Sequence, residues 1–190
     1  MDKAQLRKEL KGRLVQIAPH ERVAKSKAIC GFIVESKAFD NAAVVMLFLS
    51  LPHEVDTTSL ILSAWQRGKT VVVPKMSWEQ RHMIPVEIDS LETGLKTDRM
   101  GLRNPTSGAP VPFEEIDLVV TPGLGFDRQG NRLGRGGAYY DRFFLSHKIT
   151  AVKWGVCFSE QLCPEIPHTE NDVPMDAVVT EQGEIRCLPE

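Results

Sequence analysis

Short apolar runs, separated by segments with helical spacing, constrain the fold of this chain more than any other feature. The runs occupy residues 42–49, 70–74, 116–120, 151–158 and 176–180. Strands of a parallel sheet read as nearly continuous apolar runs, because helices cover both faces of the sheet. Apolar residues between the runs recur at helical spacing. This alternation predicts an α/β fold with three layers, α/β/α, around a mostly parallel, Rossmann-like central sheet.

The segments around these runs indicate further elements. Helices are expected over residues 2–18 and 20–36, and another should start at Thr57 or Thr58. Residues 83–88 indicate an edge strand, because Pro85 cannot donate a ladder hydrogen bond. Residues 184–188 should pair with 176–180 through a tight turn. Residues 89–112 show no clear period, and such a long loop is more often functional or mobile than decorative.

Length and composition narrow the class of protein. The 190 residues are expected to form one domain, residues 1–190. A net charge of −2 does not indicate a nucleic-acid partner. No apolar run approaches the ~20 residues that span a bilayer, and the first residues lack the apolar core of a secretory signal. The cysteines have no C-x-x-C spacing and are expected to be reduced thiols. We therefore expect a cytoplasmic monomer with neither nucleic-acid nor membrane partners.

The most unusual stretch is residues 121–141, TPGLGFDRQGNRLGRGGAYYD. It follows the expected strand 116–120, and from its end onward Tyr140, Phe143, Phe144 and His147 recur at helical spacing. In a strand-to-helix turn, backbone N–H groups can face a phosphate, and the helix dipole favours negative charge. Three arginines and three acids flank these glycines: Arg128, Arg132, Arg135, Asp117, Asp127 and Asp141. This mixture indicates a nucleotide polyphosphate with a divalent cation.

A glycine-rich turn by itself is weak support for such a site, and this one fits neither the P-loop nor the G-x-G-x-x-G pattern. Its order P-G-x-x-F-D-x-x-G-x-R-L-G-x-G, ending in Y-Y-D, nevertheless resembles the signature of 5-formyltetrahydrofolate cyclo-ligases. The resemblance extends over nearly the whole chain, to Lys3 and Arg7, residues 54–57, Met83 and residues 171–172.

One position departs from the pattern of that family. The family usually has glycine where this chain has Ala138, with Gly137 beside it. If this position has a positive φ, alanine would cost about 1 kcal/mol, unless the turn shifts onto Gly137.

The resemblance implies an activity, the ATP-dependent closure of 5-formyltetrahydrofolate to 5,10-methenyltetrahydrofolate. The formyl oxygen would attack the γ-phosphate of ATP and form an N5-iminium phosphate. N10 would then close on the activated carbon, and phosphate would leave. Such phosphoryl transfer depends mainly on positioning and charge neutralisation.

The resemblance also implies the site residues. ATP is expected to contact Lys3, Arg7, Arg132, Leu133, Gly134, Arg135, Gly136, Gly137, Ala138, Tyr139 and Tyr140. The folate is expected to contact Leu49, Glu54, Met83, Arg135, Gly136, Gly137, Ala138 and Tyr139. Arg132, Tyr139 and Tyr140 are expected to be catalytic. Asp141 and Asp172 are expected to share a Mg²⁺ ion. The alternative for Asp141 is a surface ion pair with Arg142 or Arg135.

Two other classes of protein remain open on these residues. One is a different α/β enzyme whose glycine turn binds a phosphate but no folate. The other is a catalytically silent binding protein of the same fold, which Ala138 keeps open. Release of ADP from ATP, with and without 5-formyltetrahydrofolate, would separate the three.

Overall fold

The computed structural model describes residues 2–98, 101–146 and 149–187, and in this part of the chain a seven-stranded mixed sheet forms the centre. The strand order is β11-β10-β9-β6-β1-β2-β3. The strands are Val44–Met46 (β1), Thr70–Ser77 (β2), His82–Glu87 (β3), Leu118–Pro122 (β6), Val152–Val156 (β9), Ala177–Thr180 (β10) and Gly183–Arg186 (β11). Neighbours from β10 to β2 pair in parallel, whereas β3 and β11 pair antiparallel at the two edges. The predicted α/β class and mostly parallel sheet are confirmed.

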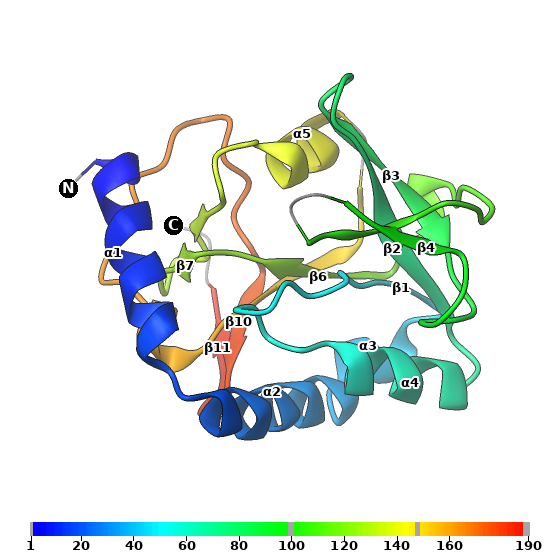
Figure 1. Cartoon of the computed structure of the whole chain (residues 1–190), viewed down its shortest axis with the longest axis horizontal. Helices are drawn as coiled ribbons and strands as arrows, with labels where there is room; N and C mark the ends of the chain where they lie inside the picture. The colour runs from blue at the N-terminus through cyan, green and yellow to red at the C-terminus, as the bar shows by residue number, and fades with distance from the viewer. Residues whose placement is uncertain (1, 99–100, 147–148, 188–190) are drawn as a thin grey trace.

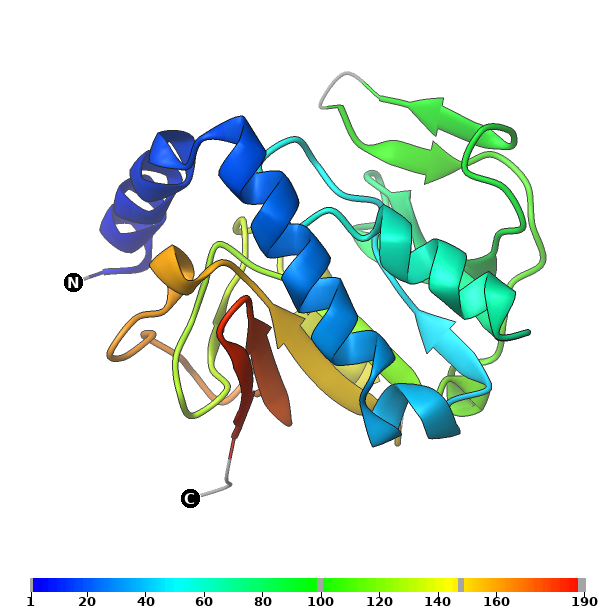
Figure 2. The same ribbon diagram turned by 90° about the horizontal axis from the view of Figure 1, so that it is seen from below.

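Helices cover both faces of this sheet. They are α1 (Lys3–Gln16), α2 (Pro19–Val34), α3 (Lys37–Asn41), α4 (Thr58–Gln66) and α5 (Tyr139–Ser146), with 3-10 turns η1 (Phe113–Glu115) and η2 (Ser159–Gln161). Figures 1 and 2 show α2, α3 and α4 on one face, α5 on the opposite face, and α1 beside β7 at one end. Among the described residues, no helix is both long and apolar enough to cross a membrane. His147 and Leu188, predicted to continue α5 and β11, lie outside the described residues.

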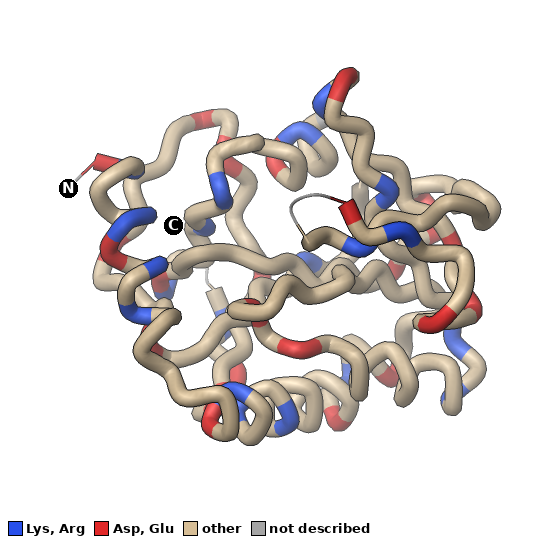
Figure 3. The backbone as a smooth tube through the Cα atoms, in the orientation of Figure 1, with Lys and Arg blue, Asp and Glu red and all other residues tan. Residues whose placement is uncertain are grey.

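Alternation along the strands divides the core between the two faces. Val71 and Val73 of β2 belong to the cluster under α2, α3 and α4, whereas Val72 belongs to the cluster under α5. Successive side chains of a strand point to opposite faces, so a continuous apolar run serves both clusters. Figure 3 shows Lys and Arg interspersed with Asp and Glu along the outer elements. The four cysteines are unpaired, as predicted.

Several strands differ in length from their predictions; β9, for example, is Val152–Val156 rather than residues 151–158, and the differences at β1 and β2 affect the site. β1 ends at Met46, and after one more backbone bond, from Leu47 to Val72, the chain leaves the sheet, so that Phe48 and Leu49 border the site described below. β2 instead continues past Pro74 to Ser77. Pro74 is tolerated there because β1 pairs with β2 only through Val72, so no ladder partner needs an N–H from residue 74 on that side.

The irregular segment 89–112 contains a small hairpin, β4 (Leu95–Thr97) paired with β5 (Arg103–Pro105). The Asn104 side chain accepts from the Met76 amide at 2.8 Å and donates to the Met76 carbonyl at 3.2 Å. One amide side chain thereby imitates a strand partner and fixes the hairpin beside β2. A second small pair, β7 (Gly125–Phe126) and β8 (Arg132–Leu133), interrupts the predicted strand-to-helix turn.

The order of the parallel strands creates a crevice. From β1 the chain passes through α4 to β2 on one side, and from β6 it passes through α5 to β9 on the other. In open α/β sheets, ligands bind beyond the carboxyl ends of strands where the direction of winding reverses. Here that point lies between β1 and β6.

Candidate active site

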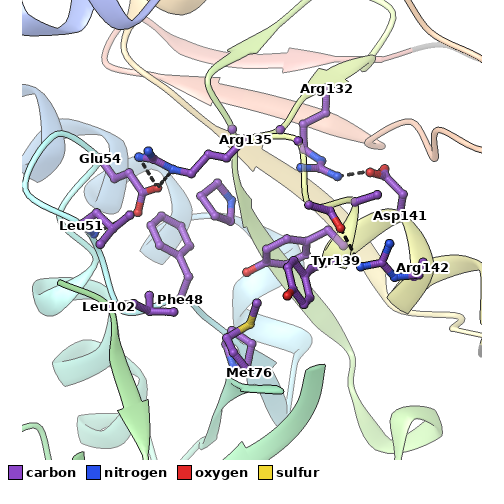
Figure 4. A pocket seen from close by; sticks show the side chains of 18 of the residues that line it. Phe48, Leu51, Glu54, Met76, Leu102, Arg132, Arg135, Tyr139, Asp141 and Arg142 are labelled. Carbon is purple, nitrogen blue, oxygen red and sulfur yellow. Dashed lines mark hydrogen bonds and ion pairs between the residues drawn. The ribbon is translucent and has the colours of Figure 1, made fainter. Parts of the chain in front are cut away.

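A pocket of about 590 Å³ lies at the carboxyl ends of β1 and β6. This volume is typical of small-molecule sites. Most of the residues predicted for the site line it: Leu49, Glu54, Arg132, Gly134, Arg135, Gly136, Gly137, Ala138, Tyr139, Tyr140 and Asp141. Figure 4 shows Phe48, Leu102 and Met76 across the pocket from Arg132 and Asp141. The pocket thus has an apolar wall and an ionic wall.

Arg132 is the most deeply buried cation of the ionic wall. It is 7% exposed, and its Nη2 donates to Asp141 Oδ1 at 2.9 Å. Its guanidinium carbon lies 5.4 Å from the centre of the Tyr140 ring. Its Nε is buried without a hydrogen-bond partner in the described part of the chain. A buried donor without a partner costs free energy, and a hydrogen bond to an acceptor oxygen of a ligand would remove that cost.

The turn of residues 134–138 passes close to these side chains. A Cβ added to Gly134 would lie 2.9 Å from Arg132 Nη1, and one added to Gly137 would lie 2.7 Å from the Tyr139 ring. Both positions therefore need glycine for close approach. Ala138 has φ +51°, while Gly137 is not among the residues with positive φ. The left-handed conformation thus falls on Ala138, and the turn does not shift it onto Gly137.

The two tyrosines at the start of α5 have different surroundings. Tyr139 meets Trp78 edge-to-face, with ring centres 5.6 Å apart, and both rings line the pocket. Tyr140 packs beside Phe144 under Arg132. Desolvation raises the pKa of Tyr140, so its hydroxyl stays protonated and can donate a hydrogen bond.

Glu54 and Arg135 form an ion pair between the β1 side and the glycine turn (Figure 4). Glu54 Oε1 accepts from Arg135 Nε at 3.1 Å and from Nη2 at 3.0 Å. Glu54 Oε2 accepts from the Leu51 amide at 2.9 Å. The Glu54 carboxylate is thus oriented by its own loop and by the turn opposite.

Helix α1 carries two further predicted residues, Lys3 and Arg7, and neither lines the pocket. Arg7 Nε donates to the Gly134 carbonyl at 2.9 Å. Lys3 Nζ donates to Asp172 Oδ2 at 2.7 Å, and the same oxygen accepts from the Thr169 amide at 2.7 Å. Partial burial alone would raise the pKa of Asp172, but the bonds from Lys3 and Thr169 outweigh it and lower that pKa.

The two aspartates predicted to share a metal ion have separate partners. Asp141 lines the pocket and pairs with Arg132, rather than with Arg142 or Arg135 as the alternative prediction had it. Asp172 pairs with Lys3 and does not line the pocket. Within the described ranges, no three His, Cys, Asp or Glu side chains are grouped so that they could hold a metal ion.

Two predicted contacts, Met83 and Leu133, are core residues that do not line the pocket. Met83 is 3% exposed and packs under α5, and Leu133 is 1% exposed against Leu6 and Leu10. Several lining residues were not predicted: Phe48, Met76, Trp78, Leu102, Arg103 and Arg142. The only sequence signal for any of these was the irregularity of 89–112, which contains Leu102 and Arg103.

The other acids near the glycines have structural partners. Asp127 is 1% exposed, and its carboxylate accepts from the amides of Gln129, Asn131 and Ile166. Asp117 accepts from the amides of residues 43 and 44 where β1 begins. Neither lines the pocket, so of the three flanking acids only Asp141 does.

Comparisons with known proteins point to one family. The sequence profile of the 5-formyltetrahydrofolate cyclo-ligase family matches residues 1–181. A 5-formyltetrahydrofolate cyclo-ligase of Mus musculus is 32% identical over 188 residues, covering 94% of this chain and 93% of the relative. One from Escherichia coli K12 is 32% identical over 145 residues, covering 73% and 78%. The solved 5,10-methenyltetrahydrofolate synthetase of Aquifex aeolicus superposes with a TM-score of 0.85 at 28% identity, covering 100% of this chain and 95% of that one.

Proposed function

The chain belongs to the 5-formyltetrahydrofolate cyclo-ligase family and has its ligase activity, and we propose that it uses ATP with Mg²⁺ to activate the formyl group as a phosphate ester. Family membership decides among the three classes that the sequence left open, in favour of the ligase. ATP, the metal, the intermediate and the residue roles are the proposed part.

The observation that carries this proposal is the buried, unpartnered Nε of Arg132 beside the turn of residues 134–138. A triphosphate supplies acceptor oxygens that would complete the hydrogen bonding of that guanidinium. Backbone amides of Gly134, Gly136 and Gly137 would share the same charge, and the start of α5 adds its dipole.

The apolar wall suits the folate. Phe48, Met76 and Trp78 offer flat and flexible apolar surface for a pterin and its linker. Glu54 supplies carboxylate oxygens that can accept pterin N–H bonds. The formyl oxygen would then approach the γ-phosphate between the two walls, beside Tyr139 and Tyr140, which also line the pocket.

The chemistry follows from charge and leaving groups. A formamide oxygen is a poor leaving group, so it must first be converted to a phosphate ester. The formyl oxygen attacks the γ-phosphorus as the bond to ADP breaks. N10 then attacks the activated carbon and loses its proton to solvent, and phosphate departs with the former formyl oxygen. Arg132 and the turn amides stabilise the charge on the phosphoryl oxygens, and protonated Tyr140 can donate to one of them.

The residues present fit a Mg²⁺ ion. Mg²⁺ is usually held by one or two carboxylates together with substrate phosphates, so a dedicated protein cage is not needed. Asp141 Oδ1 accepts from Arg132, and Oδ2 has no hydrogen-bond partner among the described residues, which leaves it for a cation. When bound, Mg²⁺ would neutralise charge on the phosphate oxygens. Asp172 remains a predicted second ligand.

The test is to mix the purified protein with ATP, Mg²⁺ and 5-formyltetrahydrofolate and to follow the methenyl product by its absorbance. We expect product only when all three are present, with one ADP released per product formed. Product without ATP would contradict the phosphate-ester route. ADP release without folate would contradict the coupling of the two substrates.

The metal proposal has its own test. Asp141→Asn should raise the Mg²⁺ concentration needed for half-maximal rate, because one anionic oxygen is lost. Asp176→Asn, at an exposed carboxylate that pairs with Lys153, is the control. A Mg²⁺ titration unchanged in Asp141→Asn would leave Asp141 with only its ion pair to Arg132.

Two broader expectations stay proposals. We infer a monomer whose partners are ATP and 5-formyltetrahydrofolate, and we place it in the cytoplasm. One relative, from Arabidopsis thaliana, is named as mitochondrial, so fractionation of the source cells is the measurement that decides the compartment.

A further inference from the structure

Arg142 follows Asp141 in α5, and its side chain contacts three separate parts of the pocket. Its Nε donates to the Arg81 carbonyl at 2.8 Å, and its Nη2 donates to the Gly137 carbonyl at 2.6 Å. Its guanidinium carbon lies 5.1 Å from the centre of the Tyr139 ring (Figure 4). One side chain therefore joins the tip of the β2–β3 hairpin, the glycine turn and the Tyr139 ring.

The two carbonyls that Arg142 binds lie at strained parts of the backbone. Arg81 has φ +53°, and Ala138, which follows Gly137, has φ +51°. Residues with a Cβ adopt this conformation only where the surrounding structure fixes it. The planar guanidinium presents several donors in a fixed fork, so it can hold both carbonyls at one separation.

The Tyr139 ring is enclosed by the same contacts. Gly137 lies directly against it, since an added Cβ there would come within 2.7 Å of the ring. Trp78, in the hairpin turn, meets the ring edge-to-face at 5.6 Å, with 87° between the planes. The hairpin tip and the glycine turn thus hold the ring between them, and Arg142 bridges the two.

We propose that Arg142 is a positioning residue that sets the separation of the hairpin tip, residues 77–82, from the glycine turn, residues 134–138, and so orients Tyr139. The inference rests on the proposed function, because it joins the wall assigned to folate with the turn assigned to ATP. Its action passes through Tyr139 and the two carbonyls. Loss of this spacing should harm the alignment of the reacting atoms more than the affinity for either substrate.

The first experiment needs no substrate. Arg142→Met removes the charge and the donors but keeps the length of the chain, and Arg186→Met makes the same change at an exposed arginine of β11. In the ligand-free protein, Arg142→Met should speed amide hydrogen exchange in residues 78–82 and 134–138 by roughly tenfold, the scale of two lost hydrogen bonds. Arg186→Met should leave both segments unchanged. Because this readout involves no reaction, it can fail while the proposed function stands.

The second experiment separates positioning from direct phosphate binding. Arg142→Met should lower kcat by about 10- to 100-fold, with little change in the Michaelis constant for ATP. Arg142→Lys keeps the charge and can restore one of the two bonds, so it should recover part of kcat. Unchanged exchange in the two segments would overturn the proposal. A higher Michaelis constant for ATP with an unchanged kcat would also overturn it. If Arg142→Met does not fold, Arg142→Lys must still speed exchange in at least one of the two segments, or the proposal fails.

Discussion

The buried guanidinium of Arg132 has a shape that a shorter cation cannot reproduce. In Arg132→Lys the charge remains, but the planar fork that reaches Asp141 while lining the pocket is lost. A charge-assisted hydrogen bond contributes about 1.5–3 kcal/mol, so kcat/KM for ATP should fall by roughly 10- to 100-fold. The measurement is steady-state kinetics at saturating folate. Arg128→Lys, an exposed position in the same motif, should change little. Equal losses in the two variants would refute a specific role for Arg132.

Ala138 holds a left-handed backbone conformation that costs an alanine more than a glycine. Ala138→Gly should therefore raise the free energy of unfolding by about 0.5–1 kcal/mol, which corresponds to a rise of about 1–4 °C in Tm. Activity should be retained or improved. Ala109→Gly, at an exposed loop position outside the residues with positive φ, should be slightly destabilising instead. A clear loss of activity in Ala138→Gly would show that the methyl group itself is needed.

Some of these residues could be predicted from the sequence, and others could not. Arg132 and the glycines belong to a long motif, and Glu54 follows an apolar run at the end where ligands collect. Met76 and Met83 are cross-strand partners, and only Met76 borders the pocket. Met76 lies in the part of β2 beyond the end of β1, and the sequence did not show where β1 ends. Arg142 binds backbone carbonyls, which leave no signal in a sequence.

Helix α1 is held to the rest of the molecule partly by the ion pair between Lys3 and Asp172. The pKa of Asp172 is lowered in the folded protein, so its contribution is complete above the unfolded value, about 3.9, and is lost as the pH falls through the folded value. Both side chains are partly exposed, so the pair is worth at most about 1 kcal/mol. Asp172→Asn should therefore lower stability slightly at pH 7 and flatten the acid-side decline below about pH 4.

Urea unfolding of the wild type and Asp172→Asn at several pH values measures this difference. Asp2 is the N-cap of the same helix and accepts from the amides of Ala4 and Gln5, so Asp2→Asn, which can still cap, is the matched control. A constant difference between wild type and Asp172→Asn down to pH 2 would show that the pair does not contribute through its charge.

Elements stabilised by apolar burial could be predicted from the sequence, whereas elements held by polar side chains could not. The long helices and the buried strands carry apolar periods, because their stability comes from burial. The β4–β5 hairpin has no such period, since Asn104 fixes it to the backbone of Met76. The β7–β8 pair is likewise held by the Asp127 carboxylate, which accepts from backbone amides. Polar side chains that bond to backbone occur in almost any loop, so elements held in this way could not be predicted from the sequence.

At the scale of the whole molecule, the order of the strands decides where the two substrates can meet. Alternating strands and helices predicted a parallel sheet, but not the position of the reversal between β1 and β6. Right-handed crossovers are common to both directions of winding, so handedness alone does not select the order. The pocket draws its apolar wall from the β1 and β2 side and its glycine turn from the β6 side.

This division predicts how a change on one wall affects each substrate. Glu54→Gln replaces an acceptor oxygen with a donor on the folate side and weakens the ion pair to Arg135. The lost bond to a pterin N–H is worth about 1.5–3 kcal/mol, whereas the ion pair to the half-exposed Arg135 is worth about 0–1 kcal/mol. The first effect should dominate, so the Michaelis constant for 5-formyltetrahydrofolate should rise roughly tenfold or more while that for ATP changes little. Glu35→Gln, exposed at the end of α2, should alter neither constant. An equal rise in both constants would mean that Glu54 acts mainly by holding Arg135 and the glycine turn, which would assign it to the structure of the ATP side rather than to the recognition of the folate.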